Sequence, residues 1–443
     1  MASAAEQLAA NMTLGSFSKA TELHKRLLFT LGALIIYRMG TYIPVPGIDA
    51  SVMAALMTKA GSGILGMYDM FTGGSLRRMT VFALAIMPYI SASIIIQLMT
   101  SAIPTLESLK KEGESGRKKL NQYTRYLTVV IATCQAYGIA LGLESQSGLV
   151  LNPGLFFVIT CVVTLVGGTV FLMWIGEQIT SRGVGNGSSL IIFSGIVANL
   201  PTSLASLLEL GRTGGIPTVV LLAIPVMAAA VIAFVVFMES AQRRVLVQYP
   251  KRQVGNKVYG GDSTHMPLKV NVSGVIPPIF ASSMLLIPAT LFKFGAAKGI
   301  TWLTPISNML SRGQPAYLLL YAALIIFFTF FYTAVVFNPT ETADNLKKNG
   351  GFIPGIRPGS ATAEYFDHVL SRLSLVGAGY LVLVCLLPEM LIDRYNVPFY
   401  IGGTSLMIMV SVTMDTVTQV QSHLLAHQYE GLIRKTRGKN RGR

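Results

Sequence analysis

Side chains that could carry out a chemical reaction are few and scattered along this sequence. The sequence contains no GxSxG, HExxH or P-loop motif. The glycine-rich GVGNG at 183–187 follows no predicted strand, so we interpret it as the turn that starts an apolar segment. The histidines lack both metal-ligand spacing and a partner acid inside an apolar segment, and stand at His24, His265, His368, His423 and His427. We therefore expect neither an enzymatic activity nor a cofactor.

The cysteines argue against a disulfide framework and against a zinc site. There are three of them, an odd number, and Cys134, Cys161 and Cys385 show no paired spacing. All three fall inside apolar segments, where a cysteine commonly serves as a small packing residue. We expect no bound metal.

The composition places the chain among membrane proteins. Of its 443 residues, 52% are hydrophobic and 12% are charged, whereas about 25% of the residues of a soluble domain are charged. The net charge of +15 could suggest nucleic acid, but the basic residues lie in the gaps between apolar runs. A polytopic membrane protein that recognises no specific nucleic acid sequence is the expected class.

The apolar runs define the predicted membrane spans. A run of roughly 17 to 25 residues crosses a hydrocarbon core of about 30 Å as a helix, and ten runs in the sequence meet this length. They are Leu27–Ile43, Met79–Ser101, Tyr126–Leu143, Leu155–Ile175, Ser188–Leu208, Pro217–Met238, Val272–Phe292, Ala316–Phe337, Leu370–Leu387 and Phe399–Val420. We therefore predict an all-α polytopic fold.

The basic residues between the spans predict which ends face the cytoplasm. Most of the 35 Lys and Arg fall in the N-terminal arm, in alternate gaps and in the tail, which makes that side cytoplasmic. The opposite side holds Arg38, Lys59, Arg77, Arg78, Arg212, Lys293, Lys298, Arg312 and Arg394. Both termini are therefore predicted to be cytoplasmic.

The same pattern divides the chain into four parts. These are a cytoplasmic arm (1–26), a first half (27–210), a second half (211–420) and a basic cytoplasmic tail (421–443). Each half holds five predicted spans, an odd number, so the halves would be inverted relative to one another.

One stretch interrupts this regular pattern. Residues 66–99 read GMYDMFTGGSLRRMTVFALAIMPYISASIIIQLM, which predicts a short helix over 67–71, a break at Gly73 and Gly74, and then the second span. Interrupted backbone is tolerated at membrane depth only where it lines a cavity or is buried in protein. The break therefore predicts a water-filled interior beside it, and a re-entrant structural loop without a pathway is the alternative.

Ionisable groups are nearly absent from the predicted spans. Arg38, Glu177 and Glu239 lie near span ends, and Asp415 lies in the inner half of the last span. An ion-coupled transporter usually needs an acid near the midplane, so that class is disfavoured, although a carbonyl-based ion site would escape this test. Gln97 is the clearest uncharged polar residue deep in a span, and it could also serve as interhelical glue.

Aliphatic side chains are abundant near the predicted cavity. A narrow ring of such residues excludes water and ions by dewetting, without a charged barrier. Composition alone cannot choose which isoleucines face a pore.

The cytoplasmic gaps predict where partners dock. Most of their Lys and Arg are explained by topology and by contact with anionic lipid. The segment GGFIPGIRPGSATAEY at 350–365 differs, because its Gly and Pro residues shape a stiff turn with Arg357 at the tip. We interpret this turn as a docking site.

At these residues the sequence resembles the SecY family, the channel subunits of the bacterial protein translocase. The likeness runs from about residue 24 to the tail. It is carried by IPVPGID at 43–49, MPYISASIIIQL at 87–98, KKEGESGRKK at 110–119, QYTRY at 122–126, GEQIT and GNG within 176–187, STHMPLKVN at 263–271, GVIPPIFASS at 274–283, FNPTETADNLKK at 337–348, GIRPG at 355–359 and GGTS at 402–405.

The resemblance implies a ten-helix channel hinged between its halves, with an hourglass pore. A lateral gate to lipid would lie between spans two and three and spans seven and eight, with Gln97, Pro277 and Pro278 on it. A plug would span about 64–76 and include Met67, Phe71, Gly73 and Gly74. The pore ring would comprise Ile86, Ile90, Ser188, Ile192, Ile279 and Ile408, in which Ser188 departs from the aliphatic pattern, although its hydroxyl can bond backward along its helix.

The resemblance also implies partners and a location. Arg357 matches the arginine that engages the SecA ATPase, while Lys251 and Arg252 resemble a second contact that ribosomes also use. SecE and SecG would be small membrane partners, and signal peptides and nascent polypeptides would be the substrates. The expected function is a passive protein-conducting channel in the bacterial inner membrane that passes unfolded secretory chains outward and releases apolar segments sideways into lipid.

Overall fold

The chain forms two compact units that are interleaved along the sequence. A computed structural model describes residues 21–49, 52–53, 69, 71–144, 148–213, 217–249, 252–254, 257–259, 263–285, 305, 314–395 and 402–440. The first unit comprises Met1–Ser93, Asn121–Pro201 and Ile408–Arg443, and the second comprises Ile94–Leu120 and Thr202–Met407. The sequence-based division into 27–210 and 211–420 stays a prediction.

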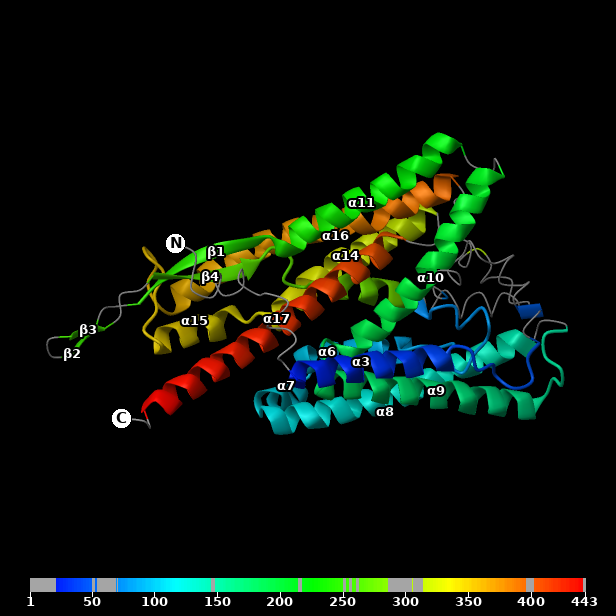
Figure 1. Cartoon of the computed structure of the whole chain (residues 1–443), viewed down its shortest axis with the longest axis horizontal. Coiled ribbons are helices and arrows are strands. Elements are labelled where there is room, and N and C mark those ends of the chain that lie inside the picture. The colour runs from blue at the N-terminus through cyan, green and yellow to red at the C-terminus, as the bar shows by residue number, and fades with distance from the viewer. Residues whose placement is uncertain are drawn as a thin grey trace. The chain divides into compact units, whose positions relative to one another are not determined.

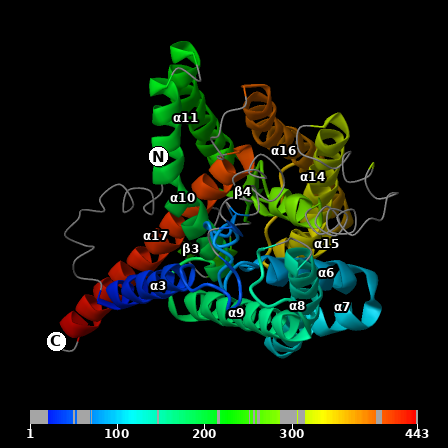
Figure 2. The same ribbon diagram turned by 90° about the vertical axis from the view of Figure 1, so that its right-hand side faces the viewer.

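The first unit is helical. It contains α3 (Thr21–Gly40), α9 (Leu155–Arg182) and parts of α6 (Met87–Ala102), α8 (Glu114–Glu144), α10 (Gly187–Arg212) and α17 (Gly403–Asn440). α3 packs on α9, and α8 runs beside α9 in both ribbon views (Figures 1 and 2). Arg125 of α8 donates from Nε and Nη2 to the two carboxylate oxygens of Glu177 of α9 at 2.8 and 2.7 Å, and this bidentate geometry fixes how the two helices meet.

The second unit is built around the long helix α16 (Ser360–Tyr395). α16 packs against α11 (Thr218–Ser240), α14 (Pro315–Val336) and α15 (Pro339–Lys348), as Figure 1 shows. The unit also holds α7 (Pro104–Lys111) and a short apolar helix, Ile276–Leu285. α15 begins at a side-chain cap, because Asn338 Oδ1 accepts from the backbone N–H of Thr340 and of Glu341.

Two small antiparallel sheets lie in the sixth gap, where the sequence analysis predicted no strands. β1 (Gln242–Gln248) pairs with β4 (Ser263–Lys269), and β2 (Arg252–Val254) pairs with β3 (Lys257–Tyr259). The register sets Val245 opposite Met266. The sequence carries a short strand pattern here, because Val245 and Val247 stand two positions apart. Both valines are buried, so they form the covered face of β1.

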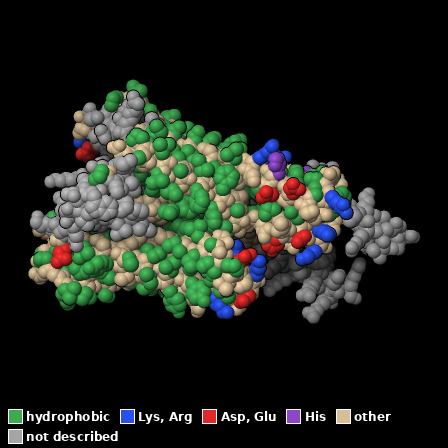
Figure 3. All heavy atoms as spheres, turned by 180° about the vertical axis from the view of Figure 1, so that it is seen from behind, with side chains coloured by type: hydrophobic (Ala, Val, Ile, Leu, Met, Phe, Trp, Pro, Cys, Tyr) green, Lys and Arg blue, Asp and Glu red, His purple; other side chains and the backbone are tan. Residues whose placement is uncertain are grey.

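Apolar side chains cover much of the face that Figure 3 shows. On α11, Val219, Leu222 and Val226 are 78%, 68% and 69% exposed, and exposed apolar surface of this kind marks contact with a membrane or with another protein. Among the described residues, six helices are long and apolar enough to span a membrane, or seven if α6 and α7, which meet at 100°, form one bent span. The chain is thus a polytopic helical membrane protein, and the count of ten spans stays a prediction.

The predicted second span begins later than expected. The sequence analysis placed its start at Met79, but residues 72–86 form turns and α6 begins at Met87. Pro88 explains this boundary, because its ring has no N–H to donate and clashes with the preceding turn of a longer helix. Hydrophobicity therefore located the segment correctly but assigned the wrong backbone conformation to its first third.

Pro277 and Pro278 do not interrupt the described helix Ile276–Leu285. The described helix starts at Ile276, so both prolines lie in its first turn, where a missing N–H costs nothing. The part of the predicted span beyond Leu285 lies outside the described residues.

Candidate functional site

The interruption predicted at Gly73 and Gly74 is present and pairs many of its own polar groups. Both glycines have positive φ, +68° and +84°, a conformation that costs other residues strain. The Asp69 carbonyl accepts from the N–H of Gly74 at 2.9 Å, and the Asp69 carboxylate accepts from the N–H of Arg77 at 2.7 Å. The Ser75 hydroxyl donates to the Thr72 carbonyl at 2.7 Å. These bonds let an irregular backbone stay buried.

The interrupted segment, which comprises the described residues within 69–86, is seated on α3. Tyr37 donates its hydroxyl to the Thr72 carbonyl at 3.3 Å, and Arg38 donates to the Gly73 carbonyl at 2.9 Å. Arg38 lies near the end of the first predicted span, and its guanidinium binds the backbone of the break. Where the segment runs on, the N–H of Val45 donates to the Met79 carbonyl at 2.9 Å and the N–H of Val81 to the Ile43 carbonyl at 3.0 Å.

A glycine of α10 completes this seat. A methyl group on Gly195 would lie 2.8 Å from the carbonyl oxygen of Phe71 and 3.2 Å from the nitrogen of Gly73. Such distances leave no room for a side chain, so Gly195 allows the two backbones to touch. Sequence analysis did not single out Gly195, because the sequence of an apolar helix does not show which of its glycines contacts another segment.

An aromatic stack joins the segment to α3 and α9. Phe82 stacks on Tyr37 and on Phe171 with centroid distances of 6.1 Å in each case, and Phe171 stacks on Trp174 at 6.0 Å. These separations fall in the range of favourable aromatic pairs. The break is therefore held by apolar packing as well as by hydrogen bonds.

The predicted ring isoleucines are all buried. Ile86, Ile90, Ile192 and Ile408 belong to the first unit, and Ile279 belongs to the second. A methyl group on Gly176 of α9 would contact the Cδ1 atoms of Ile86 and Ile191 at 3.4 and 3.6 Å. α9 thus brings the end of the interrupted segment beside the first turns of α10.

Ser188, the sixth predicted ring residue, is half-buried at the start of α10. Its hydroxyl donates to Asn186 Oδ1 at 2.8 Å, so it bonds to the preceding turn and not backward within a helix. The turn at 183–186 that precedes α10 was predicted and is confirmed.

The predicted lateral-gate residues lie in the second unit. Gln97 is half-buried on α6, and its backbone carbonyl accepts a hydrogen bond from the Thr100 hydroxyl at 2.7 Å. Pro277 and Pro278 are buried in the first turn of the short helix. The plug residue Met67 lies outside the described residues, and Phe71 is buried.

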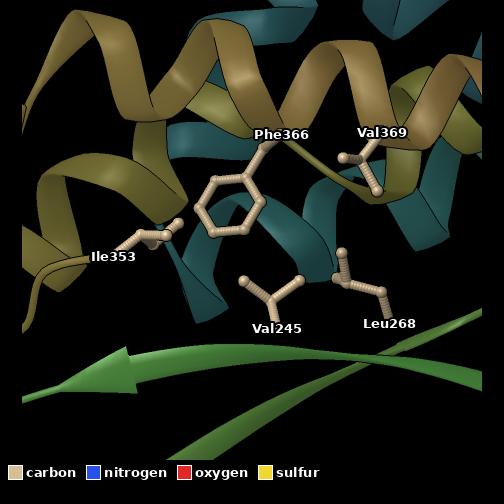
Figure 4. Close-up of a cluster of buried hydrophobic side chains, with 5 residues drawn as sticks. All are labelled: Val245, Leu268, Ile353, Phe366 and Val369. Atoms are coloured by element: carbon tan, nitrogen blue, oxygen red, sulfur yellow. The ribbon is translucent and has the colours of Figure 1, made fainter. Parts of the chain in front are cut away.

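The Arg357 turn is anchored to the hairpin of β1 and β4. Gln248 and Phe352 exchange backbone hydrogen bonds of 2.9 and 3.0 Å. The next residue, Ile353, packs with Phe366 in a buried cluster that also contains Val245, Leu268 and Val369 (Figure 4). Arg357 itself is exposed, and its carbonyl accepts from the Thr362 hydroxyl at 3.0 Å. Of the other two predicted docking residues, Lys251 lies outside the described residues and Arg252 begins β2.

Sequence analysis missed a buried acid on α16. Glu389 is 3% exposed and lies just beyond the predicted span end at Leu387, because α16 continues to Tyr395. In the same unit Tyr321 and Thr404 share a hydrogen bond of 2.9 Å. Within the part of the chain that the structure describes, no three His, Cys, Asp or Glu residues are grouped to hold a metal ion.

Long apolar helices and a buried, internally paired break define a polytopic helical membrane protein with an interrupted span. The sequence model of the SecY family matches residues 80–417. The chain therefore belongs to the SecY family.

Curated relatives are similar over nearly the whole chain. The protein translocase subunit SecY of Escherichia coli (strain K12) is 58% identical over 426 residues, covering 95% of this chain and 96% of the relative. The protein translocase subunit SecY of Rickettsia bellii is 54% identical over 435 residues, covering 96% and 99%.

Solved structures share the fold. A structure described as that of a protein conducting channel matches with a TM-score of 0.66 and 16% identity, covering 90% of this chain and 92% of that one. A second, which concerns the plug domain of SecY and the membrane seal, has a TM-score of 0.64 and 17% identity over the same shares.

Replacing Gly195 with valine should push the interrupted segment off α10. Overpacking of this kind typically costs about 1–3 kcal/mol, so Gly195→Val should lower the thermal unfolding midpoint in detergent. Gly167→Val on α9 is the matched control, because no atom lies within 4 Å of a methyl group there. Equal midpoints for the two variants would contradict the contact.

Removing the Phe366 ring should loosen the Arg357 turn. A buried Phe→Ala change costs about 3–5 kcal/mol, so Phe366→Ala should speed backbone hydrogen exchange over residues 350–359. Phe237→Ala, an exposed position on α11, serves as the control. Unchanged exchange in Phe366→Ala would show that the buried cluster does not hold the turn.

Proposed function

We propose that this protein is the channel subunit of a protein translocase, which passes unfolded polypeptides across the membrane. The observation that carries the proposal is the interrupted segment at 69–86, buried beside α3 and α10 and held by hydrogen bonds. Family membership and the channel-like fold support it. The whole-chain match to translocase subunits makes the same function the simplest inference.

The proposed mechanism needs no chemistry from the chain. A translocating segment of about 20 apolar residues gains roughly 0.3–0.6 kcal/mol for each Leu-like side chain that enters lipid, whereas an Asp, Lys or Arg at its centre costs about 2.5–3.5 kcal/mol. Apolar segments therefore leave sideways, past a lateral gate that includes Gln97, Pro277 and Pro278. Polar segments continue outward.

The proposed resting seal combines an apolar throat with a plug. Ile86, Ile90, Ile192 and Ile408 are buried without charge, and Ser188 adds one hydroxyl that Asn186 already engages. The assignment of these residues and of Ile279 to one throat rests on the family resemblance. The plug comprises about 64–76, and we propose that Phe71, Gly73 and Gly74 hold it beneath the throat together with Met67.

The proposed partners bind from the cytoplasm, where both termini also lie, at the bacterial inner membrane. The Arg357 turn would receive the SecA motor, and Lys251 and Arg252 would contribute to SecA or ribosome contact. One structural neighbour is described as Sec61 in a canine ribosome-channel complex, with a TM-score of 0.60 and 16% identity. SecE and SecG are proposed as the small membrane partners.

Placing a hydroxyl in the throat should make the resting channel leak. Ile86→Ser should weaken the closed state by about 1–2 kcal/mol, which corresponds to a roughly 5- to 30-fold rise in resting ion conductance. Planar bilayers without substrate measure this directly. Ile159→Ser, at an exposed position on α9, should conduct like the wild type, and equal conductance in both variants would refute the seal.

Reversing the charge at the tip of the docking turn should stop motor-driven transport. Loss of a charged contact that docking would bury costs about 2–5 kcal/mol, so Arg357→Glu should reduce transport into membrane vesicles more than tenfold while the protein stays folded in the membrane. Arg372→Glu, exposed on α16, is the matched control. Intact transport in Arg357→Glu would remove the docking role.

A further inference from the structure

Three different helices supply acceptors to the turn that starts α10. The N–H of Val184 donates to Thr30 Oγ1 of α3 at 3.1 Å. The N–H of Gly185 donates to Gln419 Oε1 of α17 at 2.8 Å. The N–H of Gly187 donates to Thr180 Oγ1 of α9 at 2.9 Å. We call residues 183–187 with Thr30, Thr180 and Gln419 the turn latch.

The two threonines of the latch are fixed in their own helices. The Thr30 hydroxyl donates to the Arg26 carbonyl at 2.9 Å, and the Thr180 hydroxyl donates to the Gly176 carbonyl at 2.9 Å. Each hydroxyl therefore uses its proton and a lone pair at once, which leaves one orientation for the turn.

Glycines remove any room for the turn to repack. A methyl group on Gly187 would collide with the carbonyl oxygen of Gly176, and one on Gly183 would collide with Thr30 Oγ1. Val184 packs with Leu23 of α3 and Leu424 of α17 in a small buried cluster. The latch is thus closely packed and partly shielded from water.

Each helix of the latch also holds a part of the proposed seal. On α3, Tyr37 lies about two turns after Thr30 and binds the interrupted segment. On α9, Gly176 lies one turn before Thr180 and faces Ile86. On α17, Ile408 lies about three turns before Gln419, on the same helix face.

α10 itself begins at the latch. Ser188 immediately follows the turn, and Ile192 follows about one helical turn later. A shift of the turn would therefore move both residues along the helix axis.

We propose that the turn latch sets the axial register of the helices that carry the seal, and that Gln419 is the positioning residue of this device. The proposal rests on the proposed function. Gln419 is the weakest link because its side chain is long and exposed, so water can replace it at little cost and its release restores rotamer entropy. α17 continues as one helix to Asn440. A partner that binds the basic tail would therefore act on the same helix that carries Gln419.

The test compares Gln419→Leu with Gln421→Leu in the full-length chain, purified with the partner subunits that it retains. Gln421 is exposed two residues further along α17. Gln419→Leu should raise resting ion conductance in planar bilayers about fivefold or more, whereas Gln421→Leu should match the wild type. Gln419→Glu keeps an acceptor oxygen and should restore low conductance, a rescue that a merely structural role does not predict.

Stability and transport measurements separate the possible failures. Thermal midpoints of the three variants should agree within a few degrees, and if Gln419→Leu does not fold, Gln419→Asn, whose amide cannot reach the turn, takes its place. Conductance equal to that of Gln421→Leu would overturn the latch. If instead the wild type moves no secretory polypeptide into proteoliposomes, the proposed function fails independently of the latch.

Discussion

The structure depends on one constraint, namely that backbone N–H and C=O groups must find partners where water is scarce. Regular helices meet it by themselves, but residues 72–86 do not form a helix. Their partners come from Tyr37 and Arg38, from the strand-like pairing with residues 43–45, and from bonds within the segment. The non-helical backbone of this segment is stable because neighbouring residues supply hydrogen-bond partners for its polar groups.

The same requirement explains how helices are joined in the first unit. Helices in lipid gain little from burying apolar surface, so small residues and hydrogen bonds must hold them together. Gly176, Gly187 and Gly195 let backbones approach, and Thr30 and Thr180 give their oxygens to a neighbouring turn. Glycine and threonine therefore carry much of the specificity in a chain that is mostly aliphatic.

The sequence predicted well what depends on hydrophobicity along the chain. The apolar helices lie where long apolar runs predicted them, and Gly73, Gly74 and the turn before α10 follow from backbone preference. Prediction from the sequence failed where the backbone conformation depends on residues that are distant in the chain. Met79 and Ala85 are apolar but adopt positive φ, because the segment makes short turns and also pairs with residues 43–45 instead of continuing as a helix. Gly195 and Gln419 matter only through residues far away in sequence. The strands of the sixth gap are short and lie in a basic loop, where the alternation of Val245 and Val247 covers only a few residues.

The seat of the interrupted segment has a consequence for the order of biogenesis. Tyr37 and Arg38 precede the segment in the chain, so they are ready when it is synthesised. Gly195 is made long afterwards. Until α9 and α10 are produced, the segment has only its partners on and just after α3, because Phe171 and Gly195 come later in the chain. Nascent chains that end before α10 should hence be the intermediates that most need a chaperone.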